Sequence, residues 1–170
     1  RLLEDVDLSY RRTLLPPKKF LSPPEEVLWS KEADGGYEVP PSASRPVVIF
    51  GLHPCDIHGI RILDAFFSSF GKPDSYYLRR RENLRIVGLS CTPDEQCFCQ
   101  SMNTDSVSSG FDLFLNDMGD HFLTTLGTVE GDLLLGGRAD RLPLAGEEDM
   151  KALVRTLEER LLETKGQLAQ

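Results

Sequence analysis

Residues 45–67 read RPVVIFGLHPCDIHGIRILDAFF, and the hydrophobic pattern changes its period halfway through this stretch. The β-branched run at 45–52 shows no alternation, which is typical of a strand covered on both faces. From Ile57 onward, apolar residues recur three and four apart and predict one face of an amphipathic helix ending near Gly71. The stretch therefore predicts a strand, a tight turn and a helix, with Cys55 at the turn.

A second buried-strand pattern, LRIVGLS at 84–90, also runs directly into a cysteine. If the two strands are parallel neighbours, both cysteines lie at one edge of the sheet, where open α/β folds bind ligands. Segments 111–117 and 121–128 flank a turn rich in Asp and Gly and predict an antiparallel pair. A C-terminal helix is predicted from residue 146 onward. The fold class is therefore α/β, with a mixed sheet and flanking helices.

The first 46 residues are rich in proline, which fixes φ and removes a backbone donor. We predict an extended N-terminal arm over 1–46 and an α/β domain over 47–170, together forming one domain. Several apolar side chains stand between the prolines, so the arm should lie on a surface of this domain or of a partner. These residues are Leu14, Leu15, Phe20, Leu21 and Trp29.

Composition narrows the classes of function. A net charge of −8 argues against broad nucleic-acid binding, which needs a surplus of basic residues. No apolar stretch approaches the length of a membrane span, so we expect no membrane insertion and a cytoplasmic location. Three basic clusters, Arg11/Arg12, Lys18/Lys19 and Arg79–Arg81, are interpreted as solvated surface, with an acidic patch of a partner as the alternative.

All four cysteines are Cys55 and the group Cys91, Cys97 and Cys99 in CTPDEQCFC. Three thiols in nine polar, proline-bearing residues cannot all be core, and a disulfide is unexpected in a cytosolic protein. Thiolates select Zn, Cu(I) or iron–sulfur clusters, and four of them suit a tetrahedral zinc or a 4Fe–4S cubane. The spacing lacks the paired C-x2-C-like knuckles of structural zinc sites, which favours the cluster and leaves zinc as the alternative.

Two histidines, His53 and His58, flank Cys55, and each could donate to a cluster sulfur or replace a ligand. An ordinary hydrogen-bonded histidine is the favoured interpretation, and Asp56 suits the N-cap of the helix. His121 is predicted to be solvated at a hairpin turn. No nucleophile elbow, Walker loop or G-x-G-x-x-G appears, so no catalytic residue is predicted. A flavin- or nucleotide-binding domain without such a motif remains a further alternative.

Four segments together carry a family resemblance: RRTLLPPKKFLSPP, VVIFGLHPCDIHGIRILDAFF, YYLRRRENLRIVGLSCTPDEQCFCQSM and GFDLFLNDMGDHFL. In collinear order they resemble the beta subunit of cytosolic sulfhydrogenases and the A subunit of anaerobic sulfite reductase. The resemblance extends over roughly residues 8–135, which makes it more specific than any single motif.

The resemblance implies an electron-transfer subunit of a multisubunit oxidoreductase rather than a stand-alone enzyme. Its implied partners are a flavin reductase subunit and a catalytic subunit, and the implied ligands of a 4Fe–4S cluster are Cys55, Cys91, Cys97 and Cys99. The sequence departs from the family in two respects. It contains no C-x2-C-x2-C ferredoxin-like segment, and His53 stands where the family tends to have arginine. A domain that has lost its cluster and only mediates interactions is therefore also considered.

Overall fold

A computed structural model describes residues 7, 10–12, 15–38, 45–69 and 71–168, with side chains described up to residue 162. The described elements, in chain order, are the 3₁₀ turn η2 (Pro17–Phe20), β1 (Ser30–Lys31), β2 (Tyr37–Glu38), β3 (Val47–Leu52), α1 (Pro54–Ser69), α2 (Ser75–Glu82), β4 (Leu84–Leu89), β5 (Leu113–Asp117), β6 (Phe122–Leu126), α3 (Val129–Leu134), the 3₁₀ turn η3 (Ala139–Arg141) and α4 (Glu147–Leu168).

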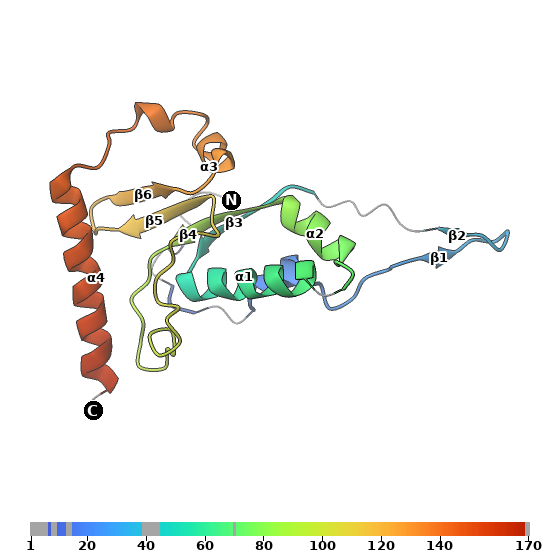
Figure 1. Cartoon of the computed structure of the whole chain (residues 1–170), viewed down its shortest axis with the longest axis horizontal. Coiled ribbons are helices and arrows are strands. Elements are labelled where there is room, and N and C mark those ends of the chain that lie inside the picture. The colour runs from blue at the N-terminus through green and yellow to red at the C-terminus, as the bar shows by residue number, and fades with distance from the viewer. Residues whose placement is uncertain (1–6, 8–9, 13–14, 39–44, 70, 169–170) are drawn as a thin grey trace.

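The main sheet has the order β3-β4-β5-β6. Both β3–β4 and β4–β5 are parallel pairs, and β5–β6 is antiparallel. The predicted mixed α/β sheet is confirmed, as are the parallel neighbours at 47–52 and 84–89 and the antiparallel pair. Figure 1 shows α1 and α2 along one side of the sheet, whereas α4 stands across the end at which β5 stops.

The two buried-strand patterns have different environments. β4 is almost wholly buried, in line with its central position in the sheet. β3 forms an edge of this sheet, and the side chains of Val48 and Phe50 are about half exposed. The prediction that β3 is covered on both faces is therefore wrong. A continuous apolar run indicates hydrophobic surface, but it does not tell which of its faces the rest of the chain covers.

Helix α1 begins earlier than the hydrophobic period predicts. Pro54 occupies its first position, where proline's missing N–H costs nothing and its fixed φ suits a helix. The carbonyl oxygen of His53 accepts from the backbone N–H groups of Asp56 and Ile57, so His53 is the residue that precedes the first turn. The predicted N-cap role of Asp56 is wrong. Asp56 and Cys55 both lie inside the first turn, near the positive end of the helix dipole.

One hydrophobic core lies between the sheet and the helices α1 and α2. Its buried members are Leu21, Leu52, Ile57, Ile60, Tyr77, Leu84, Ile86, Phe111 and Phe114. Within it, the ring of Phe114 presses on the backbone of Gly88, where an added Cβ would stand 2.4 Å from a ring carbon. Glycine is therefore required in this part of β4.

The arm contributes one fully buried residue to that core, Leu21, whose side chain has no exposed surface. The expectation that the arm lies on a surface is confirmed at this residue, and the surface belongs to this domain. Leu15, Phe20 and Trp29 are largely exposed, and Leu14 lies outside the described residues. The short β1–β2 ladder projects away from the sheet (Figure 1).

Two of the three basic clusters contain arginines that pair with carboxylates. Arg80 pairs with Glu26 of the arm and donates from Nη1 to the carbonyl oxygen of Leu21 at 3.2 Å. Arg81 pairs with Asp64 of α1 at 3.0 Å. These two contacts fasten the arm and α1 to α2, so the interpretation of this cluster as solvated surface is wrong. The Arg11/Arg12 cluster is described with the site.

The segment after β6 contains a helix that the sequence pattern does not reveal. We interpret LLLGGRAD as a turn, and Gly136 and Gly137 do have positive φ, but the preceding residues form α3. The Thr128 side chain caps this helix by accepting from the Gly131 N–H. Among the described residues, no helix is long and apolar enough to cross a membrane.

Candidate functional site

The cysteines occupy the edge of the sheet at which β3 and β4 end. Cys55 lies in the first turn of α1, three residues after β3, and Cys91 lies two residues after β4. The backbone N–H of Ser90 still bonds to Leu115 of β5 at 2.9 Å, which fixes the approach to Cys91. The juxtaposition of Cys55 and Cys91 follows from the parallel register of the two strands, as predicted.

A tight turn brings Cys97 back toward Cys91. The Asp94 carboxylate accepts from the Gln96 N–H at 2.9 Å, and the Asp94 carbonyl oxygen accepts from the Cys97 N–H at 3.0 Å. The Asp94 N–H in turn donates to the Cys97 Sγ at 3.3 Å. A backbone donor aimed at a thiol sulfur stabilises its thiolate form, which is the form that binds metal.

The chain beyond Cys99 ends in a rigid helical turn. The Thr104 N–H bonds to the Cys99 carbonyl oxygen at 2.8 Å, and the Asn103 N–H bonds to that of Gln100 at 3.2 Å. Asn103 has a φ of 52°, so this pair of bonds is a Schellman motif. The position of Cys99 is thereby fixed from its C-terminal side. Phe98, between two cysteines, is 77% exposed.

The four thiols act on one another. Burial first, and then the Cys99 and Cys97 thiols, raise the pKa of Cys91 to about 12. Burial, the charge of the Cys55 thiol and a hydrogen bond with it raise the pKa of Cys99 to about 11. The pKa of Cys55 and of Cys97 is also raised, chiefly by burial. The structure therefore gathers all four predicted residues in one region as protonated thiols, none of them in a disulfide.

This gathering is not a site for a single metal ion. Within the described ranges, no group of three or more His, Cys, Asp or Glu side chains is arranged to hold one ion. A tetrahedral zinc needs four donors at about 2.0–2.3 Å from one point. In a cubane each cysteine binds a different iron, so its four sulfurs stand farther apart. The donor set of four neighbouring soft sulfurs suits the larger group.

Residues of the arm close the other side of the site. The Tyr10 ring stacks on His53 with centroids 4.4 Å apart, and its hydroxyl donates to the carbonyl oxygen of Gly51. Burial, followed by the charges of Asp56, Cys91 and the Cys55 thiol, raises the pKa of Tyr10 to about 12. A neutral phenol therefore lies beside the thiols.

The two histidines beside Cys55 have different roles. The His58 Nε2 lies 2.9 Å from the Ser106 carbonyl oxygen, so the predicted ordinary hydrogen-bonded histidine is confirmed there. His53 is 4% exposed, and burial lowers its pKa. Its Nε2 finds no hydrogen-bond partner in the part of the chain that the structure describes, so the same prediction is wrong at that nitrogen. His121 is exposed, as predicted, and contacts Asp120.

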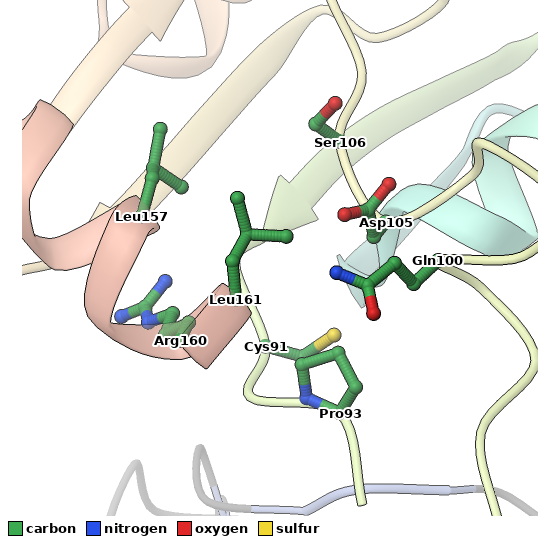
Figure 2. A pocket seen from close by; sticks show the side chains of 8 residues that line it. All are labelled: Cys91, Pro93, Gln100, Asp105, Ser106, Leu157, Arg160 and Leu161. Carbon is green, nitrogen blue, oxygen red and sulfur yellow. The ribbon is translucent and has the colours of Figure 1, made fainter. Parts of the chain in front are cut away.

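A cavity of about 170 Å³ separates the cysteine loop from α4 (Figure 2). Arg160 of α4 donates from Nη2 to the Asp117 carbonyl oxygen at 2.8 Å, which ties the helix to the end of β5. Its positive charge opposes the rise in the pKa of Cys91. The cavity is lined by Cys91, Pro93, Gln100, Asp105, Ser106, Leu157, Arg160 and Leu161.

Sequence reasoning missed three residues at this site, namely Tyr10, Arg12 and Arg160. Arg12 contacts the cysteine loop, through Asp94 at 3.1 Å and through Gln96 at 2.7 Å, so its interpretation as solvated surface is incomplete. No local pattern marks these residues, because their partners are 41 to 84 positions away in the chain. Their basic or aromatic side chains near a cysteine motif are the only sequence signal.

The fold and its site define a mixed α/β domain with four thiols gathered at the carboxyl edge of parallel strands. The chain is 42% identical over 149 residues to sulfhydrogenase 2 subunit beta of Pyrococcus furiosus. That match covers 88% of this chain and 44% of the relative, so the chain spans less than half the length of that protein. Over its matched residues, the chain belongs to the sulfhydrogenase beta subunit family, as its resemblance indicates. No family model and no solved structure matches it.

Proposed function

We propose that this chain is an electron-transfer domain of a multisubunit hydrogenase- or sulfite-reductase-type oxidoreductase, holding one 4Fe–4S cluster. The proposed ligands are Cys55, Cys91, Cys97 and Cys99. The observation that carries the proposal is that thiols from two distant segments gather at one sheet edge and raise one another's pKa. The name of the relative, a subunit of a sulfhydrogenase, supports the assignment to a larger complex.

The chain's own groups suit an anionic cluster. Cys55 lies in the first turn of α1, where free backbone amides and the helix dipole favour negative charge. The Asp94 N–H already points at the Cys97 sulfur. Such hydrogen bonds and dipoles raise the reduction potential of a bound cluster, which when present supplies a one-electron carrier.

The proposal extends to partners and location. A flavin reductase subunit and a catalytic subunit are the proposed neighbours, and the cytoplasm is the proposed compartment. The domain then passes single electrons between them and has no catalytic residue of its own. No transfer step follows from the contacts within this chain, so these assignments depend on the family alone.

Anaerobic reconstitution tests the cofactor. The chain should bind about four iron and four sulfide ions, turn brown and give the electron paramagnetic resonance signal of a reduced cubane. Cys97→Ser should lower the iron content, whereas Ser101→Ala in the same loop should not. About one tightly bound zinc per chain, without a chromophore, would refute the cluster and establish a structural zinc site instead.

A flavin- or nucleotide-binding domain and a domain that only mediates interactions would each give a different result in the same preparation. The flavin- or nucleotide-binding domain should quench flavin fluorescence or shift nucleotide absorbance on titration, and it should do so in Cys97→Ser as well. The interaction domain should bind neither iron nor zinc, and Cys97→Ser should leave electron transfer through the assembled complex unchanged.

A further inference from the structure

We propose that Arg12 is a positioning residue of the thiol site. From the N-terminal arm it fixes Asp94, and Asp94 fixes the sulfur of Cys97. The claim that this arrangement serves a cluster ligand rests on the proposed function. The claim that Arg12 controls the position of Cys97 concerns the chain itself and can be tested without metal.

The guanidinium of Arg12 contacts two residues of one turn. Its Nη2 lies 3.1 Å from Asp94 Oδ2, and its Nη1 donates to Gln96 Oε1 at 2.7 Å. A planar fork of donors can make both bonds at once, whereas the single ammonium group of lysine cannot reproduce that geometry. The Asp94 side chain is only 13% exposed, so its carboxylate is shielded from water that could replace the arginine.

Asp94 transmits this contact to Cys97 through four hydrogen bonds. Its N–H and its carboxylate Oδ1 each lie 3.3 Å from the Cys97 sulfur, and its carbonyl oxygen accepts from the Cys97 N–H. The same carboxylate closes the turn by accepting from the Gln96 N–H. Asp94 therefore holds both the backbone and the sulfur of Cys97, and Arg12 holds the other oxygen of Asp94.

The arm itself is anchored two residues before Arg12. Tyr10 stacks on the buried ring of His53 and donates to Gly51, at the end of β3. The backbone that carries Arg12 is thus fixed to the sheet, and the arginine is aimed at the loop from a defined point. Contacts that span 84 positions of the chain connect the arm to the turn that carries Cys97.

A second consequence concerns charge. Without Arg12, the Asp94 carboxylate would keep its negative charge next to a sulfur that must become a thiolate to bind metal. Like charges at this distance disfavour ionisation of the thiol. Removal of Arg12 should therefore loosen Cys97 in the metal-free chain and weaken its hold on iron in the loaded chain.

The test compares Arg12→Gln with Arg11→Gln, which removes the same charge from a neighbouring exposed residue whose influence on Asp94 is electrostatic only. In the metal-free protein, mass spectrometry follows iodoacetamide labelling of each cysteine. Arg12→Gln should label Cys97 about two- to fivefold faster, the scale of one partly exposed charge pair, with Cys55 unchanged. Arg12→Lys should fall in between.

A double substitution isolates the pathway. Once Asp94→Asn has removed the ion pair, adding Arg12→Gln should increase the labelling rate of Cys97 much less than it does alone. In reconstituted protein, Arg12→Gln should release iron to a chelator faster than Arg11→Gln. Equal labelling of Cys97 in the Arg12 and Arg11 variants overturns the inference, as do fully additive effects. A wild-type chain that binds no iron refutes the proposed function, while the labelling comparison still decides the role of Arg12.

Discussion

Replacement of Leu21 by alanine tests how the N-terminal arm is held. Leu21 has no exposed surface and belongs to the core beneath α1 and α2. Its carbonyl oxygen also accepts from Arg80, and that contact survives a change of side chain. Leu21→Ala therefore removes packing while it leaves the backbone contact of the arm in place.

The magnitude follows from the buried atoms. Losing three buried carbon groups at about 0.8 kcal/mol each gives about 2.4 kcal/mol of transfer free energy. The cavity that remains adds to this, and Leu→Ala changes in cores cost about 2–5 kcal/mol overall. We expect a loss of about 3 kcal/mol in the free energy of unfolding. For a chain of this size, the midpoint of thermal unfolding should fall by roughly 6–12 °C.

Urea unfolding of the metal-free protein, followed by circular dichroism, measures this loss. The dependence of the free energy on urea concentration should stay unchanged, which shows that only stability has altered. Leu28→Ala is the matched control, because Leu28 lies in the same arm but is 49% exposed. It should cost less than about 1 kcal/mol. If the two variants were equally stable, the arm would not be part of the core and the reasoning would fail.

Three further changes test the framework of the sheet. Gly131→Ala should cost about 1–3 kcal/mol, because an added Cβ would stand 2.1 Å from the carbonyl oxygen of Asp112; a thermal melt measures it. Asp112→Ala should cost about 2–4 kcal/mol in urea unfolding and Asp112→Asn about half, because the buried carboxylate accepts from the Thr128 hydroxyl and from a backbone N–H of β4. Burial and a hydrogen bond with Asp64 raise the pKa of Tyr77, so the folded state keeps the phenol protonated while the unfolded chain ionises near pH 10. Stability should therefore fall as pH rises above about 10, and Tyr77→Phe should show a shallower fall; an equal slope in both proteins would contradict this.

The parts of the fold that depend on local signals could be predicted from the sequence. The runs at 47–52 and 84–89 are apolar enough to identify as strands, and each is followed at once by a cysteine. Because parallel neighbours place their carboxyl ends together, the meeting of Cys55 with the later cysteines also followed. The cysteine spacing was specific enough to select these four residues as the candidate site.

The remaining features depend on contacts between distant residues. Exposure of Val48 and Phe50 depends on what covers the outer face of β3, and no periodicity within the strand encodes this. Helix α3 has six residues, too few for an amphipathic period to emerge. The contacts of Arg12 and Arg80 join the arm to segments 84 and 54 positions away. A cluster of arginines read locally cannot distinguish such contacts from solvated surface.

Gly51 gives β3 a consequence for evolution and for engineering. It has a φ of 87°, and the strand register shifts around it, so that the paired positions pass from Phe50 to Leu52. Side chains alternate between faces along a strand, so this irregularity sets the phase in which the chain enters α1. Replacing Gly51 by a β-branched residue would strain that phase and redirect Cys55 without altering a sulfur. A lineage could therefore lose the site through its backbone while every cysteine in its sequence remained in place.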